Sequence, residues 1–201
     1  MTGDGEFFFD ITFESQSETS RDRITPDTFQ RHFDKYTERF HDKFHSLFRI
    51  ERGTLFSNKQ IELAKSALSN LIGGIGYFYG VSFVKSQWSV DDTQPLHYWP
   101  NALFTATPSR TQFPRGFLWD EGFHCLLLAR WDPQATFEII GHWLDMLNTE
   151  GWIPREQILG WEARAKVPEQ FIVQDNRNGN PPTLVLCLEV CRFIVSNIKC
   201  F

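Results

Sequence analysis

The sequence predicts a mainly α-helical protein whose helices come in pairs, as in a helical toroid or barrel. Apolar residues recur at spacings of three and four over long stretches, and residues that cap helices precede these stretches. The loops between the helices concentrate Trp, Arg, Glu and Asn. Loops on a rigid helical scaffold are where binding residues gather, so this arrangement places a site at one rim of the toroid.

The amino-acid composition excludes several classes of protein. The chain has 201 residues, of which 41% are hydrophobic and 15% aromatic, which permits a substantial core and argues against disorder. The net charge is −5 and no cluster of Lys and Arg is present, so no nucleic-acid partner is expected. No stretch approaches the roughly 18 consecutive apolar residues of a membrane span. The acidic N-terminus does not have the pattern of a signal peptide.

The first 25 residues differ from the rest of the chain. Residues 7–13 have the composition of a single β-strand, which needs a partner strand to be stable. Residues 15–25 are polar and turn-like, as in a linker. Residues 1–25 are therefore predicted to be a strand and a linker that precede a helical part, residues 26–201.

The first helix is predicted to start at Thr25 and Pro26, as N-cap and first helical residue. His41 and His45 have the spacing of a zinc-binding helix, but the glutamate of that motif is absent, so they are expected to be surface histidines. An apolar stripe along this helix predicts a packing face. It consists of Phe29, Phe33, Tyr36, Phe40, Phe44, Leu47 and Phe48.

The second helix is predicted from a capping box formed by Ser57 and Gln60. It is expected to end at Gly73 and Gly74 in a turn where backbones approach closely. A phosphate-binding loop would instead follow a strand and open a helix. Residues 85–114 are rich in proline and turn formers and are predicted to be an irregular excursion that lines a site.

The later helices follow from caps and periodicity. Residues 116–131 are predicted to be helical, and Asp132 with Pro133 caps the next helix. Residues 151–180 are predicted to be irregular, and the prolines at 181 and 182 open the last helix. Within that helix, Cys187 and Cys191 stand one turn apart and are expected to be small buried residues. No further ligands have metal-site spacing, so no metal is expected.

Three polar segments are candidates for a site. An arginine, a tryptophan, two adjacent carboxylates and a histidine fall within residues 115–124. Residues 151–164 add further arginine, glutamate and glutamine side chains, and residues 178–182 form a rigid loop that enters a helix. Aromatic faces and planar polar groups in one place are typical of sugar-binding sites. The structural alternative is that Asp120 and Glu121 simply suit the first turn of a helix.

The longest motifs identify a family resemblance. FPRGFLWDEGFH, GWIPREQILGWEARAKVP and NPPTL closely resemble the processing α-glucosidases of glycoside hydrolase family 63, the mannosyl-oligosaccharide glucosidases. GGIGYFYG and LFTATPSR are similar as well, and the resemblance runs from about residue 26 to residue 190. It implies that residues 26–201 are the N-terminal part of a catalytic domain with an (α/α)6 barrel fold. Residues 1–25 would then be the remnant of a preceding β-sandwich domain.

The resemblance also implies a function. Such enzymes remove the terminal α-1,2-linked glucose from the N-linked oligosaccharide precursor on nascent glycoproteins, on the lumenal side of the endoplasmic reticulum membrane. A membrane anchor is expected only in the full-length protein. The mechanism is inverting: one carboxylic acid protonates the glycosidic oxygen while a carboxylate activates water. No cofactor is implied.

The resemblance places neither catalytic carboxylate on a residue of this chain, because both lie downstream of NPPTL, where the sequence departs from the family pattern. Gly116 and Phe123 are expected to hold the first loop in shape. Trp161 stands where a polar residue is usual, which leaves the role of its loop open. The positions expected to bind glucose are Arg115, Trp119, Asp120, Glu121, Arg155, Glu156, Gln157 and Asn180.

The sequence leaves three hypotheses open for the activity of this chain. The first is a truncated family member that is poorly stable and inactive alone, because about half of the helix pairs are missing. The second is a shortened relative that binds glucosylated glycans without turnover. The third is another inverting enzyme of the same clan, such as a trehalase-like α-glucosidase, although the WDEGFH and REQILG motifs argue against it.

Overall fold

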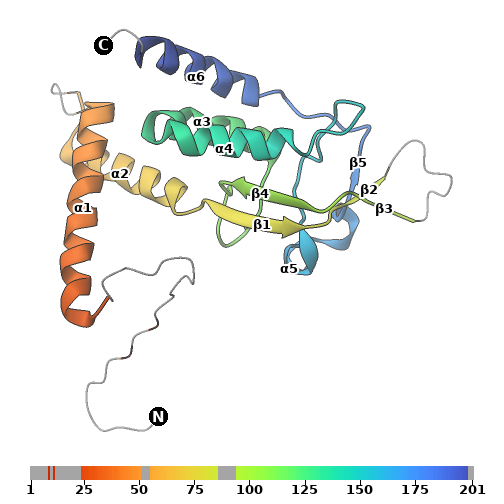
Figure 1. Ribbon diagram of the computed structural model, residues 1–201, viewed down its shortest axis with the longest axis horizontal. Helices are drawn as coiled ribbons and strands as arrows, with labels where there is room; N and C mark the ends of the chain where they lie inside the picture. Colours follow the sequence, from red (N-terminus) through yellow and green to blue (C-terminus); the bar gives the residue numbers. More distant parts are fainter. Residues whose placement is uncertain (1–8, 10, 12–23, 51–54, 86–93, 199–201) are drawn as a thin grey trace. The chain divides into compact units, whose positions relative to one another are not determined.

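The computed structural model describes residue 9, residue 11 and residues 24–50, 55–85 and 94–198 (Figure 1). The chain divides into two compact units, residues 1–53 and 54–201, and each is described here by itself. Helices dominate both units, so the prediction of a mainly helical protein is confirmed. The strand predicted at residues 7–13 lies outside the described residues except for Phe9 and Ile11, which are not in a strand.

The first unit contains one long helix, α1 (Pro26–Phe48). Its start is as predicted: the side chain of Thr25 accepts a hydrogen bond from the backbone N–H of Thr28, and Pro26 occupies the first turn. Only part of the predicted packing stripe is covered. Phe44 is buried, whereas the N-terminal half of the stripe is exposed, at Phe29, Phe33 and Tyr36.

The second unit begins with α2 (Asn58–Ile72), which Ser57 and Gln60 cap as predicted. The helix ends at Gly73, and the carbonyl of Gly74 then accepts hydrogen bonds from both the backbone N–H and the hydroxyl of Thr107, each at 3.1 Å. The predicted close approach of backbones at this glycine turn is therefore present.

The described part of the chain contains five short strands, which form by pairing between separate segments. β1 (Gly76–Gly80) pairs antiparallel with β4 (Asn101–Thr105). β2 (Phe83–Lys85) pairs antiparallel with β3 (Leu96–His97) and parallel with β5 (Val173–Asp175). The prediction that residues 85–114 are irregular is wrong for β3 and β4. Strands of two to five residues show little periodicity of their own, and their partners decide whether they form.

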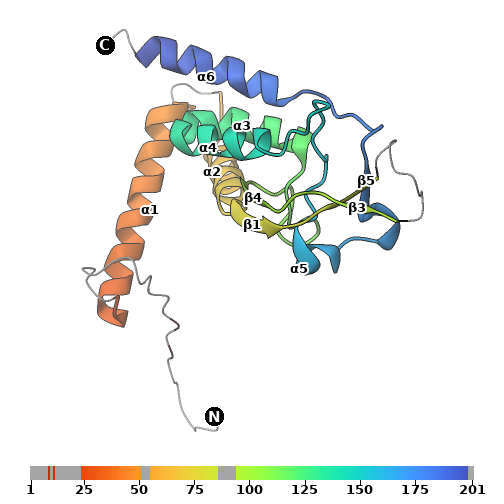
Figure 2. The same cartoon turned by 45° about the vertical axis from the view of Figure 1, so that its right-hand side comes forward.

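A helical hairpin forms the core of the second unit. α3 (Leu118–Trp131) and α4 (Pro133–Leu144) are joined by Asp132, whose side chain caps α4 through the N–H of Ala135 at 3.0 Å. The two helices lie side by side in both views (Figures 1 and 2). Both predicted helices are confirmed. The largest fully buried side chains between this hairpin and the strands include Leu103, Leu128, Ile139, Trp143 and Met146.

The C-terminal third returns to the hairpin. Residues 151–180, predicted to be irregular, contain α5 (Gly160–Arg164) and a 3-10 turn (Glu169–Phe171) besides β5. The last helix, α6 (Leu184–Ile198), starts just after the predicted prolines and packs along α3. Within it, Cys187 and Cys191 are buried as predicted, with their sulfur atoms 3.9 Å apart. No helix of the described residues is long and apolar enough to cross a membrane.

Candidate functional site

The structure brings together the three polar segments that the sequence singled out. The first and second segments pair through an isolated β-bridge between Phe117 and Glu156. On either side of it, the N–H of Leu118 donates to the carbonyl of Arg155 at 2.8 Å, and the N–H of Gln157 donates to the carbonyl of Gly116 at 2.9 Å.

The third segment joins at the start of α3. The hydroxyl of Thr183, the residue that directly follows this segment, donates to the carbonyl of Trp119 at 2.6 Å. Gly122 makes the approach possible, because a Cβ on this glycine would overlap both the backbone and the side chain of Thr183. Segments up to about 65 residues apart along the chain thus meet around the first turn of α3.

A buried ion pair connects the first two segments. The guanidinium of Arg115 contacts one carboxylate oxygen of Glu156 through Nε at 2.6 Å and again through Nη2. Both side chains are less than 10% exposed, and the rings of Phe113 and Phe117 flank the guanidinium with centroids 5.9 and 5.2 Å from Cζ. The two charges are buried together, and removing either one would leave the other unpaired at a large cost in stability. The ion pair is therefore a fixed part of the fold.

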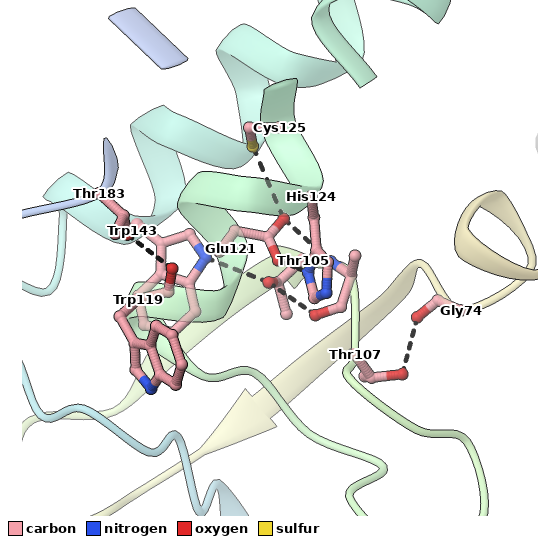
Figure 3. A network of polar contacts seen from close by, with 10 residues as sticks. Gly74, Thr105, Thr107, Trp119, Glu121, His124, Cys125, Trp143 and Thr183 are labelled. Atoms are coloured by element: carbon pink, nitrogen blue, oxygen red, sulfur yellow. Dashed lines mark hydrogen bonds and ion pairs between the residues drawn. The ribbon is translucent and has the colours of Figure 1, made fainter. Parts of the chain in front are cut away.

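A second buried network surrounds Glu121, which has no solvent-exposed surface (Figure 3). One carboxylate oxygen accepts from the N–H of Ala106 at 3.1 Å and lies 3.8 Å from the thiol of Cys125. The other oxygen lies 2.9 Å from Nδ1 of His124. The carboxylate therefore ties the segment after β4 to the first turn of α3.

The same network extends to α4. The indole N–H of Trp143 donates to the hydroxyl of Thr105 at 3.1 Å, and that hydroxyl donates to the carbonyl of Ala106 at 3.0 Å (Figure 3). Gly116 lies against these groups, since a Cβ there would come within 2.9 Å of Leu103 and Trp143. This close packing agrees with the expectation that Gly116 shapes the first loop.

Two of the predicted binding residues, Asp120 and Arg155, are near enough for the charge of one to act on the other. One carboxylate oxygen of Asp120 is buried and has no hydrogen-bond partner among the described residues. Burial raises the pKa of Asp120, an effect that its own backbone hydrogen bond and the nearby charges of His124 and Arg155 partly offset. Arg155 is exposed. The pair offers a carboxylate and a guanidinium that a polar ligand could bridge.

An aromatic surface and a half-buried amide complete the accessible groups. The ring of Trp119 is 43% exposed and meets the ring of Phe123 edge to face, with centroids 5.9 Å apart. Asn180 lines an apolar cavity of about 290 Å³ beside Trp152, and its side-chain nitrogen has no hydrogen-bond partner among the described residues.

The eight predicted site residues therefore divide into two groups. The buried set is turned into the protein: Arg115, Glu121, Glu156 and Gln157, the last donating from its side chain to the carbonyl of Pro154 at 2.6 Å. The accessible set is exposed or half-buried: Trp119, Asp120, Arg155 and Asn180.

Sequence reasoning missed a second cavity beside Arg155, of about 430 Å³. Its lining includes Lys85, Phe171 and Gln174, which belong to no recognisable motif and lie up to 89 residues apart. The parallel pairing of β2 with β5 brings these residues together, and nothing in the local sequence of either strand indicated that pairing.

The comparisons with known proteins identify the family of the chain. Residues 24–198 match the glycosyl hydrolase family 63 C-terminal domain. Alpha-glucosidase 2 of Arabidopsis thaliana is 50% identical over 163 residues, which is 80% of this chain and 20% of that protein. The mannosyl-oligosaccharide glucosidase GCS1 of the same plant is 51% identical over 160 residues, or 77% of this chain and 18% of that protein.

A yeast relative extends the match along the chain. The probable mannosyl-oligosaccharide glucosidase of Schizosaccharomyces pombe is 38% identical over 204 residues, covering 92% of this chain and 25% of that protein. The chain thus spans about a fifth to a quarter of the length of these relatives. Because the family model covers most of the sequence, including all three segments of the site, the chain belongs to glycoside hydrolase family 63.

Proposed function

We propose that this chain is the glucose-binding part of an inverting α-glucosidase that removes the terminal α-1,2-linked glucose from the triglucosylated N-glycan precursor. The observation that carries the proposal is the convergence of the three motif segments, which leaves Trp119, Asp120 and Arg155 accessible around the first turn of α3. The printed names of the relatives, mannosyl-oligosaccharide glucosidases, support the substrate class.

The accessible set has the chemistry that a pyranose ring requires. The face of Trp119 can stack on sugar C–H groups, while the carboxylate of Asp120 accepts from hydroxyls and the guanidinium of Arg155 donates to them. The buried set does not touch the sugar in this proposal. Its ion pair and carboxylate network hold the two loops at a fixed separation, and such rigid support is what makes a binding site selective.

Catalysis requires more than this chain provides. An inverting mechanism uses two carboxyl groups about 6.5–9.5 Å apart, one as acid and one as base toward water. Among the carboxylates described here, Glu121 is fully enclosed and Glu156 is ion-paired, so neither is placed to act on a sugar. The family resemblance places both carboxyl groups downstream of the NPPTL segment, so we assign the acid and the base to family segments outside residues 1–201 and expect this chain to bind without turnover.

The proposal extends to the domain architecture of the whole protein and to the cell compartment in which it acts. Residues 26–201 would form part of an (α/α)6 barrel, with the α3–α4 hairpin as one of its helix pairs, and residues 1–25 would end a β-sandwich domain. The whole protein would act on nascent glycoproteins at the lumenal side of the endoplasmic reticulum membrane, where its anchor would hold it.

Calorimetry on the chain tests the proposal directly. We expect methyl α-glucoside to bind, Asp120→Asn to weaken this binding at least about tenfold, and no glucose to be released from an α-1,2-glucosylated oligosaccharide. Trehalose should bind no better than methyl α-glucoside; a clear preference for trehalose would favour the trehalase-like alternative. Absence of glucoside binding would refute the glucose site, and robust glucose release would refute the assignment of both catalytic carboxylates to other segments.

A further inference from the structure

The loop between β5 and α6 contains an asparagine followed by a glycine, Asn178 and Gly179 (Figure 1). Both residues are exposed and lie outside regular secondary structure. The side-chain carbon of an asparagine can react with the backbone nitrogen of the residue that follows it. A glycine hinders this reaction least, because it has no Cβ. The pair is therefore a candidate for a reaction within the chain.

The backbone nitrogen of Gly179 is available for such a reaction. Its N–H donates to no hydrogen-bond acceptor among the described residues, so water solvates it. A Cβ added to this glycine would meet no atom within 4 Å, apart from its chain neighbours. Neither packing nor a hydrogen bond at Gly179 therefore opposes the rotation that brings the nitrogen to the side chain of Asn178.

Trp152 activates the same peptide group. Its indole N–H donates to the backbone carbonyl of Asn178 at 2.9 Å, and this carbonyl is bonded directly to the nitrogen of Gly179. When the nitrogen loses its proton, resonance spreads the negative charge onto the carbonyl oxygen. A hydrogen-bond donor that already points at this oxygen stabilises the charge. The structure thus provides a donor where the reaction develops charge.

The other two asparagines of this loop lack such a nitrogen. The residue after Asn176 is Arg177, whose backbone N–H donates to a neighbouring carboxylate at 2.9 Å. The residue after Asn180 is Pro181, which has no N–H at all. Of the three, only Asn178 is followed by a nitrogen that carries a proton and donates it to no described residue. The two neighbours are therefore internal controls.

We propose that Asn178 is a modification site, which converts without an enzyme into aspartate and isoaspartate. The nitrogen of Gly179 gives up its proton and forms a bond to Cγ of Asn178. The Cγ–Nδ2 bond breaks, its electron pair leaves with the nitrogen, and the NH₂ group takes up a proton and departs as ammonia. The product of this step is a cyclic imide.

Water then opens the imide at one of its two carbonyl groups. Cleavage between Cγ and the nitrogen gives aspartate, whereas cleavage at the backbone carbonyl gives isoaspartate, in which the chain runs through Cγ. Either product adds a negative charge next to Asp175, whose carbonyl accepts from the N–H of residue 178 at 3.0 Å. Isoaspartate also lengthens the backbone that leads to Asn180. The inference does not rest on the proposed function, since it uses only groups of this chain and water.

Incubation of the full chain at physiological temperature and pH tests the inference. Digestion and mass spectrometry measure the replacement of NH₂ by OH at each asparagine, and Asn178→Asp gives the chromatographic reference for the aspartate product. We expect conversion at Asn178, with an isoaspartate peak besides the aspartate peak, and no conversion at Asn176 or Asn180. Ammonia released into solution should match the conversion.

Two substitutions test the role of each group. Gly179→Ala should slow the conversion at least about tenfold, because a Cβ hinders the attacking nitrogen. Trp152→Phe keeps an aromatic ring but removes the donor, and should slow it about threefold to tenfold, the factor expected for one hydrogen bond. Trp161→Phe is the matched control, at an indole that is 73% exposed, and should leave the rate unchanged.

The outcomes decide between this inference and ordinary asparagine ageing. An Asn178 that survives the incubation unchanged, or that reacts no faster than Asn176, overturns the modification site. A Trp152→Phe rate equal to or above that of the wild type overturns the role assigned to the indole. Gly179→Ala gives an independent check, because its new Cβ lies in open space and leaves the fold intact. A rate unchanged in this variant overturns attack by the backbone nitrogen.

Discussion

The buried and accessible sets occupy neighbouring positions in the chain yet differ in their surroundings. Asp120 and Glu121 are adjacent, as are Arg155 and Glu156, and in each pair one side chain points to the accessible side and the other into the protein. Successive side chains diverge by about 100° around a helix and point to opposite faces of an extended strand. A motif of consecutive polar residues therefore supplies two layers, one that is accessible and one that is buried.

The two layers also differ in how a substitution should act. A buried charge is stable only while its partner remains, so changes in the buried set should be read in the free energy of unfolding. An accessible, partly desolvated carboxylate lowers stability slightly, and under the proposed function it contacts the sugar, so substitutions of the accessible set should change sugar affinity. The following substitutions test this contrast, from the largest expected effect to the smallest.

Arg115→Met should lower the free energy of unfolding by about 3–5 kcal/mol, because it leaves the buried carboxylate of Glu156 without its partner. Urea denaturation followed by tryptophan fluorescence measures the change. Arg177→Met is the matched control, because its pair with Asp175 is solvent-exposed on the arginine side and should be worth less than about 1 kcal/mol. Similar losses in both variants would contradict a structural role for the buried pair.

Glu121→Gln should lower the free energy of unfolding by about 1–3 kcal/mol. The substitution keeps the shape of the side chain but replaces one carboxylate oxygen by an NH₂ group, which weakens the charge-assisted contacts to Ala106 and His124. Thermal denaturation gives the comparison with Glu138→Gln, an exposed change on α4 that should stay within about 0.5 kcal/mol. If the buried variant matched its control in stability but lost sugar binding, Glu121 would belong with the accessible set.

Asp120→Asn should have the smallest effect on stability, and of opposite sign. Burial raises the pKa of Asp120 in the folded state, so the folded chain holds this proton more tightly than the unfolded chain does. Stability from this group is therefore lost as pH rises from the ordinary carboxyl pKa through the raised one. The asparagine variant lacks this loss and should unfold at a slightly higher temperature at neutral pH.

The pH dependence of the unfolding temperature checks that sign. The difference between Asp120→Asn and wild type should grow as pH rises through the raised pKa of Asp120 and then level off. A variant that is less stable than wild type at neutral pH would show that the carboxylate supports the fold, which would remove the distinction between Asp120 and Glu121.

The sequence by itself determined where most helices begin and which family the chain resembles. Thr25, Ser57 and Asp132 cap their helices as predicted, because a cap is a hydrogen bond to a backbone N–H three residues away. The buried state of Cys187 and Cys191 also followed from their helical spacing. These features depend on a few neighbouring residues, so local sequence is sufficient to predict them.

Only the tertiary structure decided which polar residues are accessible and where the second cavity lies. The ion pair between Arg115 and Glu156 joins residues 41 positions apart, and the pairing of β2 with β5 joins residues 90 positions apart. Which side chains are buried depends on these contacts between distant residues. The local sequence around one residue does not indicate which distant residue it will contact. Motifs therefore indicated the eight candidate residues, but only the fold divided them into a buried and an accessible set.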